Sequence, residues 1–497
     1  MALAASTVWE VRPTAGADTN GGGFVPGSSG TDWTQQNGTQ YALTNGTTNG
    51  TTTVATASAV ADMVGNIAYI AGGTGSITGA WYQIVSQITG VSITVDRSTG
   101  LTAGTGVTIN IGGALATVSQ GFTSAVACNT LWVKASGTYT AAATITTSLQ
   151  SGQNGSNGTA FQVIGYTTTR GDNGQFTWTT STNSVNLVTF SYSAGYGAGF
   201  VFRNIKFTCT AGTPGNGLYI ANNGGRVTNL SVVNCYFSGF AVGISALNYG
   251  NTNDLGEIIV ENTEITACTG YGMSNTVALM IGCYLHGNAG GGVNLWNSSD
   301  PVQAMVLLRC TIYNNTGYGL YIQGNQPGCQ VVVINCNFVS NTNNGLYFTQ
   351  SGSTGIGQLF VSNSIFVSNG GYGIASALTT GGTGSLCTFI GLYNAFYNNT
   401  NGNYQSLSAQ ASDIALTGSP FNSPSGGDFS LNGTAGMGAA CKAAGYQGTL
   451  AGAVGGTTSA AIDLGAVQSA SSGGGGGPVT NYIVAPTRTV VFVEDGY

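Results

Sequence analysis

The side chains best suited to acid–base chemistry are four carboxylates that fall within eleven residues: Asp254, Glu257, Glu261 and Glu264. The whole chain of 497 residues has only sixteen Asp and Glu, so a quarter of them gather here. Hydrolysis of a glycosidic bond needs two carboxyl groups about 5 to 9.5 Å apart, one of them with a raised pKa. Glu261 and Glu264 flank Asn262 and are therefore the catalytic candidates, with a solvated charged surface as the alternative.

Other residues that carry chemistry are few. Arg309 occupies the position of Asn262 two repeats later, near enough to pair with an acid. The single histidine, His286, is predicted at a surface turn, and Arg170 to Asp172 form a loop tripeptide. The ten cysteines contain no CxxC pair, so neither a metal site nor a disulfide framework is indicated, and no cofactor is predicted.

The composition favours strands over helices. Charged residues make up 5% of the chain, and there are 81 glycines. Surface helices usually need a charged face, whereas Gly, Thr, Asn, Val and Ile suit strands and tight turns. The fold class predicted is therefore all-β.

Charge and hydropathy disfavour some classes of partner and location. The formal charge of −6 and the absence of a basic cluster disfavour nucleic acid. The start, "MALAASTVWEVRP", lacks the features of a signal peptide, and no apolar run of about 18 residues predicts a membrane span. We therefore expect synthesis and folding in a reducing cytoplasm.

A repeated phrase predicts the architecture. "VINCNFVSNTNNGLYF" (333–348) returns in weaker form from Val232 and from Val361. Repeats at intervals of 20 to 31 residues align at one position: Asn204, Asn234, Asn262, Gly282, Arg309, Asn335, Asn363 and Asn394. Short strands joined by bends at such a period wind a parallel β-solenoid that rises about 4.8 Å per coil.

The position after this asparagine points inward and is often cysteine. It holds Cys235, Cys283, Cys310 and Cys336. Stacked thiols behave as small buried hydrophobes, and in-register parallel strands point neighbouring Cβ atoms the same way, which is awkward for a disulfide. We predict free thiols at these positions.

The first strand of each repeat is apolar on both faces. Its outward residues form what we call the apolar stripe: Val233, Ile259, Ile281, Val306, Leu308, Val332, Ile334 and Phe360. A contiguous apolar patch of several hundred Å² is larger than a lone soluble protein usually leaves bare. Another copy of the solenoid, the head or the end of the same chain would cover it.

The flanks differ from the repeats. Residues 1–125 are predicted to form a small β module that serves as an attachment head, and residues 126–470 form the solenoid with a closing segment. Residues 471–497 combine a Gly-rich linker with a strand-forming docking tail: Tyr482, Ile483, Val484, Val490, Val491, Phe492 and Val493. A tethered apolar strand normally docks on a partner surface.

These features carry a family resemblance. The repeats, and "TLWVK" followed by "GTY" (130–139), resemble the right-handed parallel β-helix of pectate lyases and phage tailspikes over roughly residues 126–470. "VWEVRPTAGADTNGGGF" (8–24) is similar to the head of phage β-helix proteins. The resemblance implies that the asparagine position forms a side-chain ladder at one corner, and that the protein is a homotrimer with solenoids side by side.

The leading hypothesis is a non-enzymatic phage virion protein, displayed as capsid decoration, neck or tail fibre. It would be made in the host cytoplasm and would bind other virion proteins and host polysaccharide. The alternative is a tailspike depolymerase that acts as glycoside hydrolase or lyase, and a third hypothesis is a bacterial surface adhesin. Five outward tyrosines would stack on sugars or across coils: Tyr236, Tyr284, Tyr318, Tyr321 and Tyr347.

Overall fold

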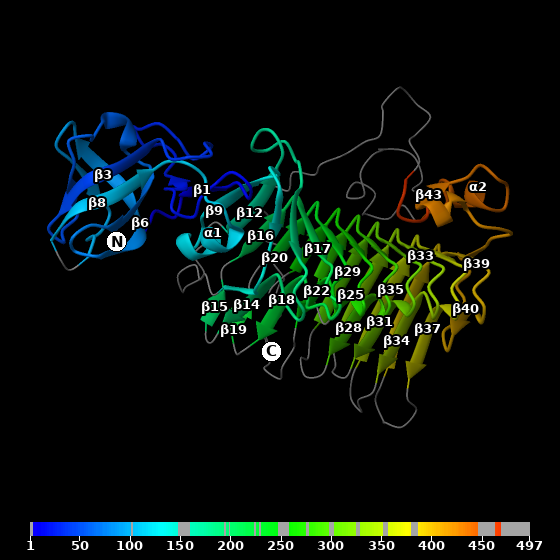
Figure 1. Cartoon of the computed structure of the whole chain (residues 1–497). Helices are drawn as coiled ribbons and strands as arrows, with labels where there is room; N and C mark the ends of the chain where they lie inside the picture. The colour runs from blue at the N-terminus through cyan, green and yellow to red at the C-terminus, as the bar shows by residue number, and fades with distance from the viewer. Residues whose placement is uncertain are drawn as a thin grey trace, which may run out of the picture.

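The computed structural model shows an elongated stack of coils with a small separate module at its N-terminal end (Figure 1). It describes residues 3–100, 103–147, 160–192, 195–197, 199–222, 225–227, 230–246, 258–274, 278–297, 303–324, 329–350, 356–378, 386–445 and 463–468. The docking tail, Asp254 and Glu257 lie outside these described residues.

Three long sheets, whose solenoid strands pair in parallel, form the walls of the solenoid, and each coil contributes one strand to each sheet. The 12-stranded sheet runs β2 (Gly23–Phe24), β1 (Val8–Val11), β9 (Thr130–Lys134), β12 (Phe161–Tyr166), β16 (Phe200–Arg203), β20 (Leu230–Val233), β23 (Ile258–Glu261), β26 (Ala278–Ile281), β29 (Gln303–Leu308), β32 (Cys329–Ile334), β35 (Ile356–Ser362) and β38 (Leu386–Leu392). Its first pair, β2 with β1, is antiparallel. The prediction of an all-β parallel solenoid is confirmed.

The other two walls follow the same order. The 11-stranded sheet runs β10 (Thr138–Thr140), β13 (Phe176–Thr180), β17 (Ile205–Cys209), β21 (Tyr236–Ser238), β24 (Glu264–Thr266), β27 (Tyr284–His286), β30 (Thr311–Tyr313), β33 (Asn337–Val339), β36 (Ile365–Val367), β39 (Ala395–Tyr397) and β41 (Ile414–Ala415). The 10-stranded sheet runs β11 (Ile145–Thr147), β14 (Val188–Tyr192), β18 (Leu218–Asn222), β22 (Ile244–Ala246), β25 (Tyr271–Ser274), β28 (Gly291–Asn297), β31 (Tyr318–Gly324), β34 (Leu346–Gln350), β37 (Tyr372–Leu378) and β40 (Gly402–Gln405). A short pair, β15 (Gly195–Gly197) and β19 (Gly225–Val227), lies beside it.

The core is a column of inward side chains that repeats from coil to coil. Phe207 and Phe237 stack at 4.6 Å between ring centroids, and Phe338, Phe366 and Phe396 continue the pattern at 4.9 and 5.3 Å. At the N-terminal end, helix α1 (Val118–Ser124) closes the column, because Phe122 packs on Phe161 and Trp178. The solenoid is thus filled by side chains and capped.

The corner between the 12- and 11-stranded sheets is a single left-handed residue. Asn204, Asn234 and Asn262 adopt φ of 59°, 52° and 46°, a conformation that asparagine tolerates better than most residues. In the last coil this residue is Tyr393, with φ 56°, and Asn394 takes the next, inward position. The alignment from the sequence was therefore wrong by one residue there.

The hydrogen-bonded asparagine ladder lies six residues after that corner. It consists of Asn288, Asn315, Asn341, Asn369 and Asn399. From Asn315 onward, each Oδ1 accepts from the backbone N–H and the amide of the asparagine one coil earlier; Asn341 Oδ1, for example, lies 3.3 and 2.9 Å from Asn315 N and Nδ2. Asn288 Oδ1 accepts instead from Cys268 N at 3.0 Å. At the left-handed corner, Asn234 Nδ2 donates a hydrogen bond to Asn204 Oδ1 at 2.7 Å. The ladder of five asparagines thus lies at a second position, which the sequence did not predict.

The inward cysteines are free thiols, as predicted. Cys235 is 2% exposed, and Cys283, Cys310 and Cys336 are fully buried. Burial raises the pKa of Cys235 to about 12. These residues fill the core as small apolar groups.

The N-terminal module is a closed barrel of β3 (Tyr41–Thr48), β4 (Thr53–Ala55), β7 (Ser92–Val95), β6 (Ile77–Ile88), β5 (Ile67–Gly72) and β8 (Gly104–Ile111), with a short helix η1 (Ala61–Met63). Strand β1, from the same end of the chain, instead pairs with β9 as the first rung of the solenoid. Barrel and solenoid are therefore joined by more than one crossing of the chain.

A buried ion-pair network ties this end together. Glu10 on β1 is fully buried and pairs with Arg12 at 3.1 Å and with Arg170 at 2.7 Å. Tyr166 donates a hydrogen bond to the same carboxylate. Asp172 accepts hydrogen bonds from the backbone of its own loop, including Thr168 N at 2.6 Å. The tripeptide 170–172 is thus part of the architecture.

A closing segment covers one end of the 11-stranded sheet. It contains β42 (Phe421–Ser423), η2 (Pro424–Gly426), β43 (Asp428–Leu431) and α2 (Gly438–Cys441). Phe421, Phe429 and Leu431 join Ile365 and Val367 of β36 in one buried cluster. The earlier strands of that sheet, β17 to β27, carry a hollow on their outer face.

Candidate functional site

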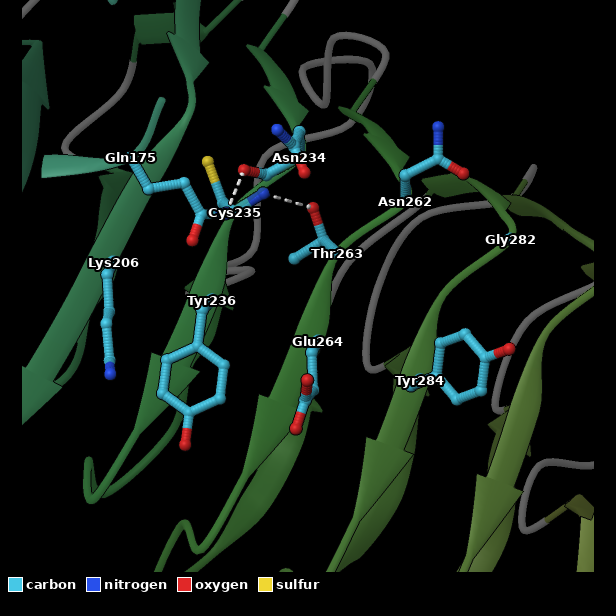
Figure 2. Close-up of a pocket in the computed structure, with 10 residues that line it drawn as sticks. All are labelled: Gln175, Lys206, Asn234, Cys235, Tyr236, Asn262, Thr263, Glu264, Gly282 and Tyr284. Carbon is cyan, nitrogen blue, oxygen red and sulfur yellow. Dashed lines mark hydrogen bonds between the residues drawn. The ribbon is translucent and has the colours of Figure 1, made fainter. Parts of the chain in front are cut away.

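The candidate site is an open hollow of about 340 Å³ on the outer face of the 11-stranded sheet (Figure 2). It is lined by Gln175, Lys206, Asn234, Cys235, Tyr236, Asn262, Thr263, Glu264, Gly282 and Tyr284. Its volume is at the lower end of the range for small-ligand sites. A shallow surface of this size suits a few units of a larger molecule better than an enclosed cofactor.

Four outward side chains form the working surface of the hollow. Lys206, Tyr236, Glu264 and Tyr284 lie on adjacent strands β17, β21, β24 and β27, in direct register. Because outward positions of parallel strands repeat every 4.8 Å or so, the two tyrosines stand about 9.6 Å apart with Glu264 between them. The repeat thus sets an alternation of ring and carboxylate along the solenoid axis.

The two tyrosine rings present their faces outward. Figure 2 shows both rings face-on, on either side of Glu264. Tyr284 is 38% exposed, and the Nζ atom of Lys206 lies 5.2 Å from the centroid of the Tyr236 ring. Exposed aromatic faces beside hydrogen-bonding groups are the surface that the apolar face of a sugar ring requires.

The corner residues keep the hollow open and its rim fixed. Gly282 has φ 63°, and a Cβ atom there would lie 2.7 Å from Asn262 Oδ1. Gln175 donates from Nε2 to the carbonyl of Asn234 at 2.8 Å. Thr263 is buried and donates to the Glu261 carbonyl at 2.9 Å. These hydrogen bonds within the protein fix the rim before a ligand binds.

Glu264 is linked by contacts to the closing segment. His286 Nε2 lies 3.0 Å from Glu264 Oε1, and Nδ1 lies 3.2 Å from Thr266 Oγ1. The imidazole stacks on Tyr313 at 4.6 Å, and Tyr313 in turn packs against Phe429 at 4.7 Å. His286 thus orients the carboxylate, a role that goes beyond the surface turn predicted for it.

Asp428, a carboxylate of the closing segment, does not line the hollow, but its charge acts on Tyr284. Its Oδ1 accepts from Ser430 N at 2.9 Å and Ser430 Oγ at 2.6 Å, and these bonds lower the pKa of Asp428. Burial raises the pKa of Tyr284, and nearby groups, Cys310 first and then the charges of Asp428 and Glu264, add to this effect. The sequence carried no signal for Asp428, because 163 residues separate it from Glu264 in the chain.

The two predicted catalytic glutamates do not line the same hollow. Glu261 ends β23 on the neighbouring 12-stranded sheet, where burial raises its pKa and the positive charge of Arg203 partly opposes this. Arg309 is the left-handed corner residue of its coil, with φ 53°, and burial lowers its pKa. Of the three candidates, Glu264 lines the hollow, and the structure brings it together with His286.

The other outward tyrosines stack on one another. Tyr318, Tyr321 and Tyr347 lie on β31 and β34 of the 10-stranded sheet, with ring centroids 5.0 to 5.7 Å apart and planes within 19°. Each ring therefore packs against the other two. For these three residues, the expected cross-coil stacking is confirmed.

The described ranges contain no group of three or more His, Cys, Asp or Glu placed to hold a metal ion. Within the same part of the chain, no helix is long and apolar enough to cross a membrane.

Comparison with known proteins agrees on the fold. A family described as "Right handed beta helix region" matches residues 216–400, less than half of the chain. No curated protein matches the chain.

Three solved structures illustrate the similarity. The crystal structure of pectate lyase Pel9A is 15% identical, with a TM-score of 0.47, covering 72% of this chain and 91% of that one. A rhamnogalacturonan lyase is 12% identical, with a TM-score of 0.37, covering 62% and 86%. The catalytic unit of a GH87 alpha-1,3-glucanase from Streptomyces thermodiastaticus is 11% identical, with a TM-score of 0.36, covering 76% and 87%. At such identities the function has to be argued from the hollow itself.

Proposed function

We propose that this protein is a polysaccharide-binding β-helix that holds its ligand along the outer face of the 11-stranded sheet. The observation that carries this proposal is the in-register series Tyr236, Glu264 and Tyr284 on β21, β24 and β27. Two outward tyrosines whose strands are about 9.6 Å apart offer stacking surfaces for two separate sugar units of one chain. The carboxylate between them accepts hydrogen bonds from sugar hydroxyls.

The fixed geometry favours binding. Glu264 is held by His286, and the rim is held by Gln175 and Thr263, so few side chains lose freedom when a ligand arrives. Preorganisation of this kind lowers the entropic cost of association. The sheet continues beyond the hollow on the β13 side, whereas on the other side the closing segment packs on Tyr313 of β30, the strand next to β27.

The test is binding of purified bacterial surface polysaccharides on an array, followed by titration of the best ligand. Replacing either tyrosine (Tyr236→Ala or Tyr284→Ala) removes one stacking surface and should cost about 1 kcal/mol, roughly a fivefold rise in Kd. The control is Tyr393→Ala, a 36% exposed tyrosine on another coil. Equal affinities for all four proteins would refute the site.

Cleavage of the bound chain is a separate question. A glycosidase needs one carboxyl with a raised pKa close to a second carboxylate. Glu261 has the raised pKa but lies on the other sheet and does not line the hollow. The geometry therefore supports binding more directly than hydrolysis. If the wild type forms halos on host lawns and Glu264→Gln abolishes them while Glu261→Gln does not, the protein is a depolymerase acting through this hollow.

A second candidate function, display on a phage particle, rests on the barrel. Val85, Ile88 and Val91, at the tip of the β6–β7 hairpin, are 44%, 63% and 55% exposed. An exposed apolar tip of this kind suits attachment to another protein. Its test is proteomics of purified particles, in which the chain should be found. If the chain is not found in the particles, the proposal of display on a virion is refuted, whereas the glycan-binding proposal is unaffected.

A further inference from the structure

The outer face of the 12-stranded sheet is apolar along much of its length. Of the apolar stripe, Val233, Ile259, Ile281, Val306, Leu308, Val332 and Phe360 are partly exposed, and Ile334 is 6% exposed. Strand register places these residues in two columns. In the first, Ile259, Leu279, Val306, Val332 and Phe360 are consecutive neighbours. In the second, Glu261 stands between Val233 and Ile281, and Ser362 follows Ile334. Ile390 continues that column and is 48% exposed.

The size of the apolar stripe decides what kind of partner it fits. From β20 to β38 it spans six strand spacings, about 29 Å, and two outward positions give it a width of roughly 12 Å. Its outline, which includes the polar Ser231, Glu261 and Ser362, is therefore about 350 Å², less than half of the ~800 Å² that each partner buries in a stable protein–protein interface. A second solenoid would need much more surface, whereas one extended segment matches this area.

The last described residues of the chain, 463–468, lie at the edge of the apolar stripe. Asn335, the residue after Ile334, donates from Nδ2 to the carbonyls of Asp463 and Gly465 at 2.8 and 3.3 Å. The Gly465 N–H donates to the carbonyl of Asn363 at 2.7 Å. Residues 463–468 therefore run along the corner beside the stripe, and the chain that follows starts there.

The sequence after Gln468 has the length and chemistry to fill the stripe. Ten residues, 469–478, are mostly Ser and Gly, and a linker of this composition spans about 18 Å on average. The twelve residues 482–493 include six of Ile, Val and Phe and would reach about 40 Å when extended. Glu494 and Asp495 follow, and the exposed Arg203 stands at the far end, on β16.

We propose that the apolar stripe is the docking surface for residues 479–495 of the same chain. The segment runs from the β35 end toward β16 and lays its apolar side chains over Leu308 and Ile281. A tether of ten residues gives an effective concentration in the millimolar range, which favours the chain's own tail over a segment from solution. This inference is independent of the proposed glycan site.

The experiment places a photo-crosslinking p-benzoylphenylalanine at position 492 of the full-length chain. After irradiation, mass spectrometry of peptides identifies the residues reached. A mixture of isotope-labelled and unlabelled protein separates crosslinks within a chain from those between chains. The matched control carries the same probe in place of Thr400, which is exposed on a loop away from the stripe.

The expected result is intrachain crosslinks to peptides that contain 278–281 or 303–308, absent with the Thr400 probe. Val491→Asp in the tail should reduce their yield at least fivefold, and this change leaves every solenoid residue in place. Ile281→Lys on the stripe should do the same. Crosslinks between chains would overturn the proposal and assign the stripe to another copy, as the predicted trimer requires. Crosslinks to other surfaces, or none, would also overturn it.

Discussion

Removing one rung of the asparagine ladder should loosen the coil before it. In Asn341→Ala, the backbone N–H of Asn315 and one N–H of its amide lose their acceptor, Asn341 Oδ1. Asn315 is 1% exposed, so water cannot easily replace that acceptor. Each buried donor left unpaired costs about 1 to 3 kcal/mol, which gives about 2 to 6 kcal/mol for the two.

The assay is native-state hydrogen exchange at the Asn315 amide. A local cost of 2 kcal/mol corresponds to about a 30-fold faster exchange. The guanidinium midpoint should fall as well, although a solenoid of stacked coils need not unfold in two states. The control is Asn343→Ala, an exposed residue on the same turn. Equal exchange at Asn315 in both variants would refute the claim that the ladder carries stability.

Three further predictions concern single residues. Cys235 should resist iodoacetamide at pH 8 in the native protein and react after unfolding, because burial raises its pKa to about 12; a mass two protons lower per pair without reductant would reveal disulfides instead. Gly345→Ala should cost about 1 to 3 kcal/mol, since its Cβ would lie 2.8 Å from a backbone oxygen, whereas Gly433→Ala, in open space, should leave the unfolding midpoint unchanged. Asp172→Asn should speed amide exchange at Thr168 at neutral pH. Backbone hydrogen bonds hold the Asp172 pKa below its usual value, so its contribution is present above about pH 4 and is lost as the pH falls through the lowered pKa; a difference between the two proteins that does not shrink as the pH is lowered below about 4 would contradict this.

The repeat made most of the solenoid predictable. Asn335, Cys336 and Phe338 each recur at a fixed offset, and one corner, one inward thiol and one core ring follow from that offset. The corner of the last coil was predicted one residue too late, because two neighbouring residues fit the repeat. Tyr393 and Asn394 are adjacent, and asparagine is the usual residue at such a corner, although tyrosine adopts the left-handed conformation here with φ 56°.

The site was less predictable because it depends on contacts between distant segments. Glu264 was identified from its type and spacing, but its partner was taken to be Glu261. A left-handed corner at Asn262 turns the chain between those two residues, so their side chains belong to different sheets. Asp428 and the stacking of His286 on Tyr313 depend on how the closing segment folds back, which no local pattern encodes.

The most direct test of the glycan site is hydroxyl-radical footprinting of the tyrosines with and without the best-binding polysaccharide. Tyr236 and Tyr284 have outward ring faces beside Glu264, whereas the faces of Tyr318, Tyr321 and Tyr347 cover one another. We predict that saturating ligand slows oxidation of Tyr236 and Tyr284 severalfold and leaves the other three unchanged. Protection confined to the stacked three, or no protection at Tyr236 and Tyr284, would contradict the proposed binding surface.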